Sequence, residues 1–182
     1  MSDVNSPPSP NPLPIDAGKQ PNDNWCWAYV AAAISRYHDG DQTPWTACNL
    51  ANAAFGGHGQ IDCARHVNSK ICDRTYHLKD AFRNFTRNLR EPPVGPVDAE
   101  TIRHEILVKR APVCVRVLWP GGRDHGHVFI IRGIGVDSRG HDIVMITDPI
   151  FGESRWRLAD LRYKYQSGNG YWDETYFTQP SS

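Results

Sequence analysis

The feature that most constrains the fold is a change in the character of the chain at Pro112. The chain before Pro112 predicts helices, whereas after it short runs rich in β-branched residues alternate with turn residues. We expect helices over residues 26–38, 45–55, 77–90 and 98–110. We expect strands over residues 112–119, 127–134, 142–148, 153–158 and 171–178, a hairpin turn at 137–140 and a short helical turn at 159–165. Helices followed by an antiparallel sheet indicate the α+β class.

The length of 182 residues fits one domain with a single sizeable core. Residues 1–17 are rich in Pro, Ser and Asn and predict a flexible arm, so the domain itself is expected over residues 18–182. The sequence Glu91-Pro-Pro-Val-Gly-Pro96 breaks the chain. It is expected to separate a helical subdomain, about residues 18–95, from a β subdomain, about residues 96–178.

Charge and hydropathy exclude some partners. Lys+Arg and Asp+Glu are both 20, so the chain lacks the cationic surplus typical of nucleic-acid-binding proteins. No apolar run approaches the roughly 20 residues of a membrane span, and no membrane partner is expected. The first 14 residues have neither the basic start nor the apolar stretch of a Sec signal peptide. The protein is therefore expected to work in the cytoplasm, to leave by another route, or to have lost an export signal.

The stretch Gln20-Pro-Asn-Asp-Asn-Trp-Cys26-Trp-Ala28 is typical of a nucleophilic thiol. Cys26 begins an apolar, alanine-rich helix, and the N-terminus of a helix favours a thiolate. A side-chain amide shortly before that helix, here Gln20, can donate a hydrogen bond to the oxyanion formed when sulfur attacks a carbonyl. Trp25 and Trp27 are expected to pack the helix and the floor of a cleft.

A base and its partner are available in the second half of the chain. His127 opens the apolar strand Val-Phe-Ile-Ile and is the predicted general base. His125 lies on the same face of that strand and is expected to line the rim of the cleft. Asp148 ends the next strand, and the hairpin is expected to bring it opposite His127, where it would fix the orientation of the imidazole.

The chain has five cysteines, and apart from Cys26 their chemical state has three possible interpretations. Cys48, Cys63 and Cys72 cluster in the middle of the chain, whereas Cys114 lies in a strand and is expected to be a buried hydrophobe. The cluster could form a disulfide, either Cys63–Cys72 or Cys48–Cys63, which would indicate an oxidising destination. It could instead bind zinc with histidines such as His58, His66 or His77, although the paired spacing of common zinc sites is missing. Reduced, inert thiols are the third interpretation.

The ordered segments QPNDNWCWA, GHVFIIRGI and ITDP resemble the papain-like cysteine peptidases, in particular their compact bacterial branch. The stretch CNLANAAFGGHGQIDCARHVNSKIC followed by HLKDAF resembles the cysteine-bearing insert of proteases related to plant-pathogen avirulence proteases. Bacteriocin-processing peptidases are more distantly similar. Members with this insert often have a double cysteine where this chain has Cys63-Ala64, and papain orients its histidine with asparagine where this chain has Asp148.

The resemblance implies a papain-like fold, with a helical half carrying Cys26, a β half carrying His127 and the active site in the cleft between them. It implies Cys26, His127, Asp148 and Gln20 as catalytic residues. We predict that Trp27, His125 and Gly126 contact the substrate. Neither a metal nor an organic cofactor is expected.

The resulting hypothesis is a monomeric cysteine endopeptidase that cleaves protein or peptide substrates through a thioester acyl-enzyme. The same residues serve deubiquitinase-like, amidase, transglutaminase-like and peptidoglycan-cleaving enzymes, so another bond is the first alternative. An inactive binding module on a papain-like scaffold is the second. Similarity to translocated proteases suggests a bacterial effector, secreted or translocated into a target cell, whose activity could require a host factor.

Overall fold

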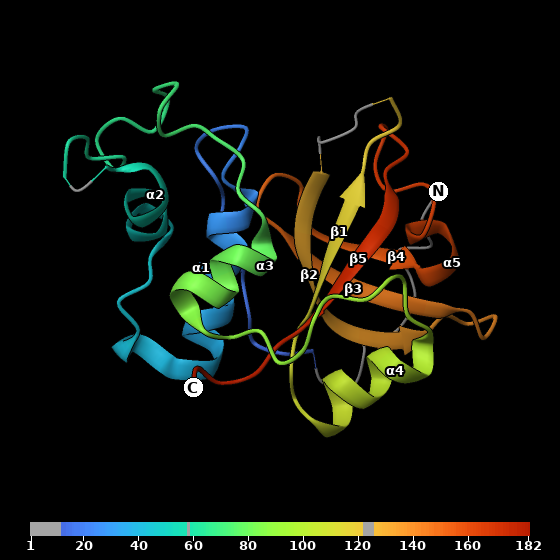
Figure 1. Ribbon diagram of the computed structural model, residues 1–182. Coiled ribbons are helices and arrows are strands. Elements are labelled where there is room, and N and C mark those ends of the chain that lie inside the picture. Colours follow the sequence, from blue (N-terminus) through green and yellow to red (C-terminus); the bar gives the residue numbers. More distant parts are fainter. Residues whose placement is uncertain (1–11, 58, 122–125) are drawn as a thin grey trace.

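The computed structural model describes residues 12–57, 59–121 and 126–182. The molecule has a helical part and a sheet part that lie side by side, with the C-terminal end beside the helices (Figure 1). The helical part contains α1 (Cys26–Asp39), α2 (Ala47–Phe55) and α3 (Leu78–Ala81). The sheet part contains five antiparallel strands, flanked by α4 (Ala99–Arg103) and α5 (Leu158–Leu161). This arrangement confirms the predicted α+β class.

Helix α1 is the centre of the helical part. Its small alanines allow close packing, and its inner face is buried against α2, α3 and the sheet. The helix ends at Gly40, whose φ of 72° is a conformation that residues with a Cβ rarely adopt. The predicted end at Asp39-Gly40 is therefore confirmed. Helix α2 begins two residues later than predicted, because the Thr46 side chain caps it by accepting from the Asn49 N–H.

The predicted helix over residues 77–90 is shorter than expected. Helix α3 continues into a π-helical turn at Phe82–Thr86 and stops at Arg87, which has a φ of 62°. The following residues bond instead to the C-terminal segment: Asn88 Nδ2 donates to the Gln179 carbonyl, and the Arg90 N–H donates to the Phe177 carbonyl. Pairing with a distant segment thus replaces the last helical turn.

The helix predicted from Asp98 is present. The Asp98 carboxylate accepts from the Thr101 N–H at 2.8 Å and caps α4, which continues into a π-helical turn at His104–Val108. Glu105 in that turn is buried, and its carboxylate is paired with Arg90 and Lys109. The π-helical turn at the end of α4 therefore has one side buried against the core and one side exposed to solvent.

The sheet has the strand order β4-β3-β2-β1-β5, with every neighbouring pair antiparallel. A bulge interrupts the β2–β3 pairing between Ile131 and Gly133. Each predicted strand is found at or close to its expected place: β1 (Val113–Leu118), β2 (Gly126–Val136), β3 (Asp142–Asp148), β4 (Gly152–Arg157) and β5 (Tyr171–Phe177).

The prediction of a flexible arm over residues 1–17 is wrong for its last part. Leu13, Ile15 and Ala17 are buried, and they alternate with more exposed neighbours as in an extended segment. The Leu13 N–H donates to the Arg132 carbonyl at 2.7 Å, and the Ala17 N–H donates to Thr147 Oγ1 at 2.9 Å. Residues 12–17 therefore lie against the sheet; residues 1–11 are outside the described residues.

Across the described ranges, we found no helix long and apolar enough to cross a membrane.

Candidate active site

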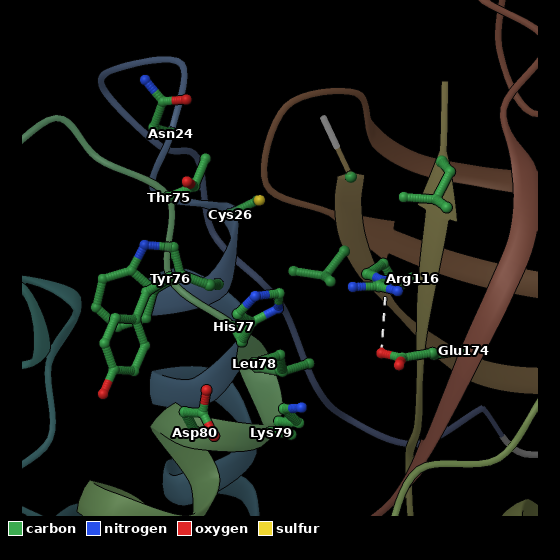
Figure 2. A pocket seen from close by; sticks show the side chains of 14 residues that line it. Asn24, Cys26, Thr75, Tyr76, His77, Leu78, Lys79, Asp80, Arg116 and Glu174 are labelled. Atoms are coloured by element: carbon green, nitrogen blue, oxygen red, sulfur yellow. Dashed lines mark ion pairs between the residues drawn. The ribbon is translucent and has the colours of Figure 1, made fainter. Parts of the chain in front are cut away.

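Cys26 is the first residue of α1 and is 8% exposed. The helix starts without a side-chain cap and has no acidic residue in its first turn. Because the first N–H groups of a helix have no partner within the helix, they can stabilise negative charge on the sulfur or on a bound carbonyl. Figure 2 shows the sulfur pointing into the cavity between the helical part and the sheet.

His127 faces Cys26 from the sheet. It is the second residue of β2, and its Nε2 lies 2.7 Å from Asp148 Oδ2 at a site where both residues are almost completely buried. The Cys26 thiol and the imidazole line the same cavity, and the thiol is among the groups that raise the pKa of His127. Since Nε2 faces the carboxylate, Nδ1 is the nitrogen left for the sulfur. The structure thus brings the three predicted residues together.

The hairpin places Asp148 differently from the prediction. We expected it directly opposite His127, but β2 pairs Ile130 with Thr147. By this register, the residue of β2 opposite Asp148 would be Phe129 and not His127. The reason is that His127 lies two residues further from the turn than Asp148 does. Alternate residues of a strand share a face, so Asp148 still reaches His127 as a diagonal neighbour.

Four donors surround the Asp148 carboxylate. Its Oδ1 accepts from the backbone N–H groups of Ile150 at 2.7 Å and Phe151 at 2.9 Å. Its Oδ2 faces His127 and also accepts from the Tyr165 hydroxyl at 2.6 Å. The sequence analysis missed Tyr165, because it lies 17 residues beyond Asp148 in a turn without a motif.

The surroundings of His127 favour its protonated form. Burial opposes a charge on the ring, but the hydrogen bond to Asp148 and the interaction with Cys26 outweigh it and raise the pKa of His127 to about 10. Burial also works against the charge on Asp148. The hydrogen bonds from His127 and Tyr165 prevail and hold the pKa of Asp148 below its ordinary value. The pair is therefore an imidazolium and a carboxylate over the physiological pH range.

Gln20 lies beside these residues. Its backbone N–H donates to the Pro149 carbonyl at 3.0 Å, one residue after Asp148, and its side chain is buried. One hydrogen of Nε2 is donated to the Asn22 carbonyl at 2.6 Å. Nε2 carries a second hydrogen, which is the kind of donor that a bound oxyanion needs.

Two cavities meet at Cys26. A larger one of about 740 Å³ extends from Cys26 along α3 and β1, with Trp27 and Leu78 in its wall. A smaller one of about 330 Å³ lies toward His127 and Phe151. Four residues line both cavities: Asn24, Cys26, Thr75 and Gly126.

The predicted substrate contacts have different outcomes. Trp27 is buried and lines the larger cavity, and its Nε1 donates to the Arg74 carbonyl at 3.1 Å. Gly126 lines both cavities, and a Cβ there would approach the side chains of Arg116 and Leu118 to 3.2–3.3 Å. His125 lies outside the described residues.

The disulfide joins Cys63 to Cys72, which is one of the two predicted pairings, and Cys48 is a free thiol. Residues 63–74, here called the disulfide loop, are held against the nucleophile segment. Trp25 Nε1 donates to the Cys72 carbonyl at 2.8 Å, and the Asn24 side chain donates to Asp73 Oδ1 at 3.0 Å. The disulfide loop thus supports the residues that precede Cys26.

The zinc interpretation does not fit this arrangement, because Cys63 and Cys72 are joined in a disulfide and cannot bind a metal as thiolates. In the described parts of the chain, no group of three or more His, Cys, Asp or Glu side chains could hold a metal ion. His58 lies outside those parts.

Comparisons with known proteins identify the family of the chain. Residues 11–166 match the family model described as "Papain-like cysteine protease AvrRpt2". A search of curated proteins gave no match. Among solved structures, the chain is similar to the bromelain protease from Ananas comosus in complex with the E64 inhibitor. The identity is 17%, the TM-score is 0.42, and the match covers 91% of this chain and 94% of that chain. The matched family covers most of the sequence, so the chain belongs to the AvrRpt2 family of papain-like cysteine proteases.

Proposed function

We propose that this cysteine protease is an endopeptidase whose catalytic residues are Cys26, His127 and Asp148. The observation that carries the proposal is the buried His127–Asp148 pair, 2.7 Å apart, beside a thiol at an uncapped helix start. The cavities on the two sides of Cys26 support internal cleavage, because a substrate chain can extend from the scissile bond in both directions.

The proposed reaction begins with a Cys26 thiolate and a His127 imidazolium. The sulfur attacks the scissile carbonyl carbon and forms a tetrahedral oxyanion. Collapse of this intermediate expels the amine, which takes the Nδ1 proton of His127 and leaves a thioester on Cys26. Neutral His127 then removes a proton from water, the hydroxide attacks the thioester, and the acid is released with recovery of the thiolate–imidazolium pair.

Asp148 holds the imidazole in position during both steps. Its Oδ2 accepts from Nε2, so Nδ1 is the nitrogen directed at the sulfur and the substrate. The oxyanion would be bound by the backbone N–H of Cys26 and by Nε2 of Gln20. The position of Gln20 between Pro149 and Asn22 supports this role.

Labelling of the pure protein with E-64 or iodoacetamide, located by peptide mass spectrometry, tests the proposal. We expect one fast adduct on Cys26 near neutral pH, no such adduct in Cys26→Ala, and much slower labelling in His127→Ala. The remaining free thiols provide an internal control, because Cys114 is fully buried and burial raises its pKa far above the ordinary value. Slow labelling spread over several cysteines would contradict the proposal.

The bond that is cleaved is tested separately. A labelled, active Cys26 with hydrolysis of peptide libraries at internal positions supports an endopeptidase. Activity confined to cell-wall fragments, ubiquitin conjugates or simple amides would assign the same residues to another acyl transfer.

We further propose that the protease is exported. The Cys63–Cys72 disulfide supports this, because disulfides persist mainly in oxidising compartments. Protein recovered from the medium of the producing cells should contain the disulfide, whereas protein found only inside the cells, with reduced Cys63 and Cys72, would refute export.

A further inference from the structure

Tyr165 is a buried residue in contact with the catalytic carboxylate. It follows α5 in the chain, is 0% exposed, and its hydroxyl donates to Asp148 Oδ2 at 2.6 Å. The same oxygen faces His127 Nε2 at 2.7 Å. Tyr165 and His127 therefore share one acceptor atom, while Oδ1 is occupied by two backbone N–H groups.

The position of the Tyr165 hydroxyl is fixed from several directions. The backbone of Tyr165 pairs with Gly170 through two hydrogen bonds of 2.9 Å. Its ring packs against Phe129 at 4.4 Å and Trp156 at 5.3 Å between ring centroids. The hydroxyl donates its hydrogen to Asp148 Oδ2. A group held in this way can fix the orientation of its partner.

The phenol is also a permanent donor. Burial, followed by the negative charge of Asp148, raises the pKa of Tyr165 well above its ordinary value. Tyr165 therefore keeps its proton throughout the pH range in which the enzyme folds and works. It neither titrates nor exchanges protons with the substrate, and it lines neither cavity that meets Cys26.

We propose that Tyr165 is a positioning residue of the protease, which acts on His127 through Asp148. Its hydroxyl anchors the carboxylate oxygen that orients the imidazole, and it draws off part of the negative charge that would otherwise act on the imidazolium. This inference rests on the proposed roles of Cys26, His127 and Asp148. Packing alone would be satisfied by phenylalanine, whereas a buried hydroxyl aimed at a carboxylate adds a charge-assisted hydrogen bond.

The titratable groups around His127 come from four separate places in the fold. Within the described ranges they are Cys26 at the start of α1, Asp148 on β3, Tyr165 after α5 and, at the rim of the smaller cavity, Asp23. Burial opposes the charge on His127, and Asp148 and Cys26 together outweigh it. Removal of the Tyr165 hydroxyl would leave the charge on Asp148 less neutralised and strengthen its hold on the imidazolium.

The test is Tyr165→Phe, with Tyr37→Phe as the matched control. Tyr37 also donates its hydroxyl at 2.6 Å, but to the Arg110 carbonyl, away from the catalytic residues. Active sites are counted with E-64, and kcat and KM are measured from pH 5 to 10.5 on a peptide that the protease cleaves. For Tyr165→Phe we expect a roughly tenfold lower kcat, the scale of one charge-assisted hydrogen bond. We also expect an unchanged KM and an alkaline limb moved to higher pH, whereas Tyr37→Phe should match the parent.

Asp148→Asn separates this inference from the proposed function. If Tyr165 acts through the carboxylate, Tyr165→Phe should cost little further activity in an Asp148→Asn background. Wild-type kcat and an unmoved alkaline limb in Tyr165→Phe, together with a strong loss in Asp148→Asn, would overturn the role of Tyr165 alone. An Asp148→Asn variant as active as the parent would instead overturn the proposed triad.

A second variant covers the case in which Tyr165→Phe does not fold. 3-Fluorotyrosine at position 165 keeps the ring and the hydroxyl but is a more acidic, stronger donor. It should neutralise Asp148 further and move the alkaline limb to lower pH, the direction opposite to that of phenylalanine. No movement, or movement to higher pH, would refute the proposal. A lower melting temperature with an unmoved alkaline limb would assign Tyr165 to the core only.

Discussion

His127 carries its charge in a buried place because the groups around it compensate for the lost water. Its folded pKa of about 10 lies above the ordinary value of 6.5, so folding favours the imidazolium. A group with a raised pKa contributes stability that is fully present below the unfolded pKa of about 6.5. That contribution is lost as the pH rises through the folded pKa of about 10.

We therefore predict that the stability of the wild-type protein relative to His127→Gln is largest near pH 6 and declines progressively toward pH 10. Urea unfolding of both proteins at several pH values measures this difference. Parallel stability curves over that range would show that His127 is not held as an imidazolium in the folded protein. Asp148 has the opposite sign, since its lowered pKa gives a contribution that is lost only in acid.

The elements that carry the site were predictable to different degrees. Cys26, His127 and Asp148 could be chosen from the sequence because each lies at a recognisable helix start or strand end. Tyr165 could not, since its partner is distant in the sequence and its own turn carries no motif. The early end of the helix at Thr86 was equally hidden, because the pairing of residues 88–90 with the C-terminal segment is non-local.

The disulfide loop is the element that most directly supports the nucleophile. Its backbone carbonyls and Asp73 accept hydrogen bonds from Asn24, Trp25 and Trp27, which surround Cys26 in the sequence. The disulfide closes a short loop, with a sequence separation of 9. Loss of the disulfide is therefore expected to loosen the segment before α1 as well as the loop itself.

We predict that the double variant Cys63→Ser/Cys72→Ser loses roughly 2–3 kcal/mol of stability, the chain-entropy value for a loop of this size. Labelling of Cys26 by E-64 should slow by about tenfold, because the helix start is less firmly placed. Cys48→Ser is the control, since Cys48 is a half-buried free thiol outside the disulfide. Wild-type labelling by the double variant would show that the disulfide serves the loop alone.

The two ends of the described chain connect the two parts of the molecule. Residues 12–17 lie on the sheet and lead to Gln20 and Cys26, whereas the C-terminal segment returns to the helices, where the Ser181 N–H donates to Asp39 at 2.8 Å. Helix α1 of the helical part contacts strand β2 of the sheet part (Figure 1). Cys26 is the first residue of α1 and His127 lies on β2, so the candidate active site spans both parts. The N-terminal segment and the C-terminal segment, which each contact one part and lead to the other, therefore help to hold the Cys26 thiol and the His127 imidazole at a fixed separation.

The last prediction concerns residues 12–17, the segment that lies on the sheet and leads to Gln20 and Cys26. Leu13 is completely buried, and its N–H and carbonyl both bond to Arg132 of β2. Leu13→Ala should remove packed methyl groups and cost about 2–4 kcal/mol, the range for a buried leucine. Val108→Ala is the control, because Val108 is 67% exposed and its truncation should change stability by less than about 0.5 kcal/mol. Composition alone assigns residues 12–17 to a flexible arm, and in that case the two variants would unfold at the same urea concentration. A lower midpoint for Leu13→Ala alone would show that the segment is part of the folded core and that the domain begins before Gly18.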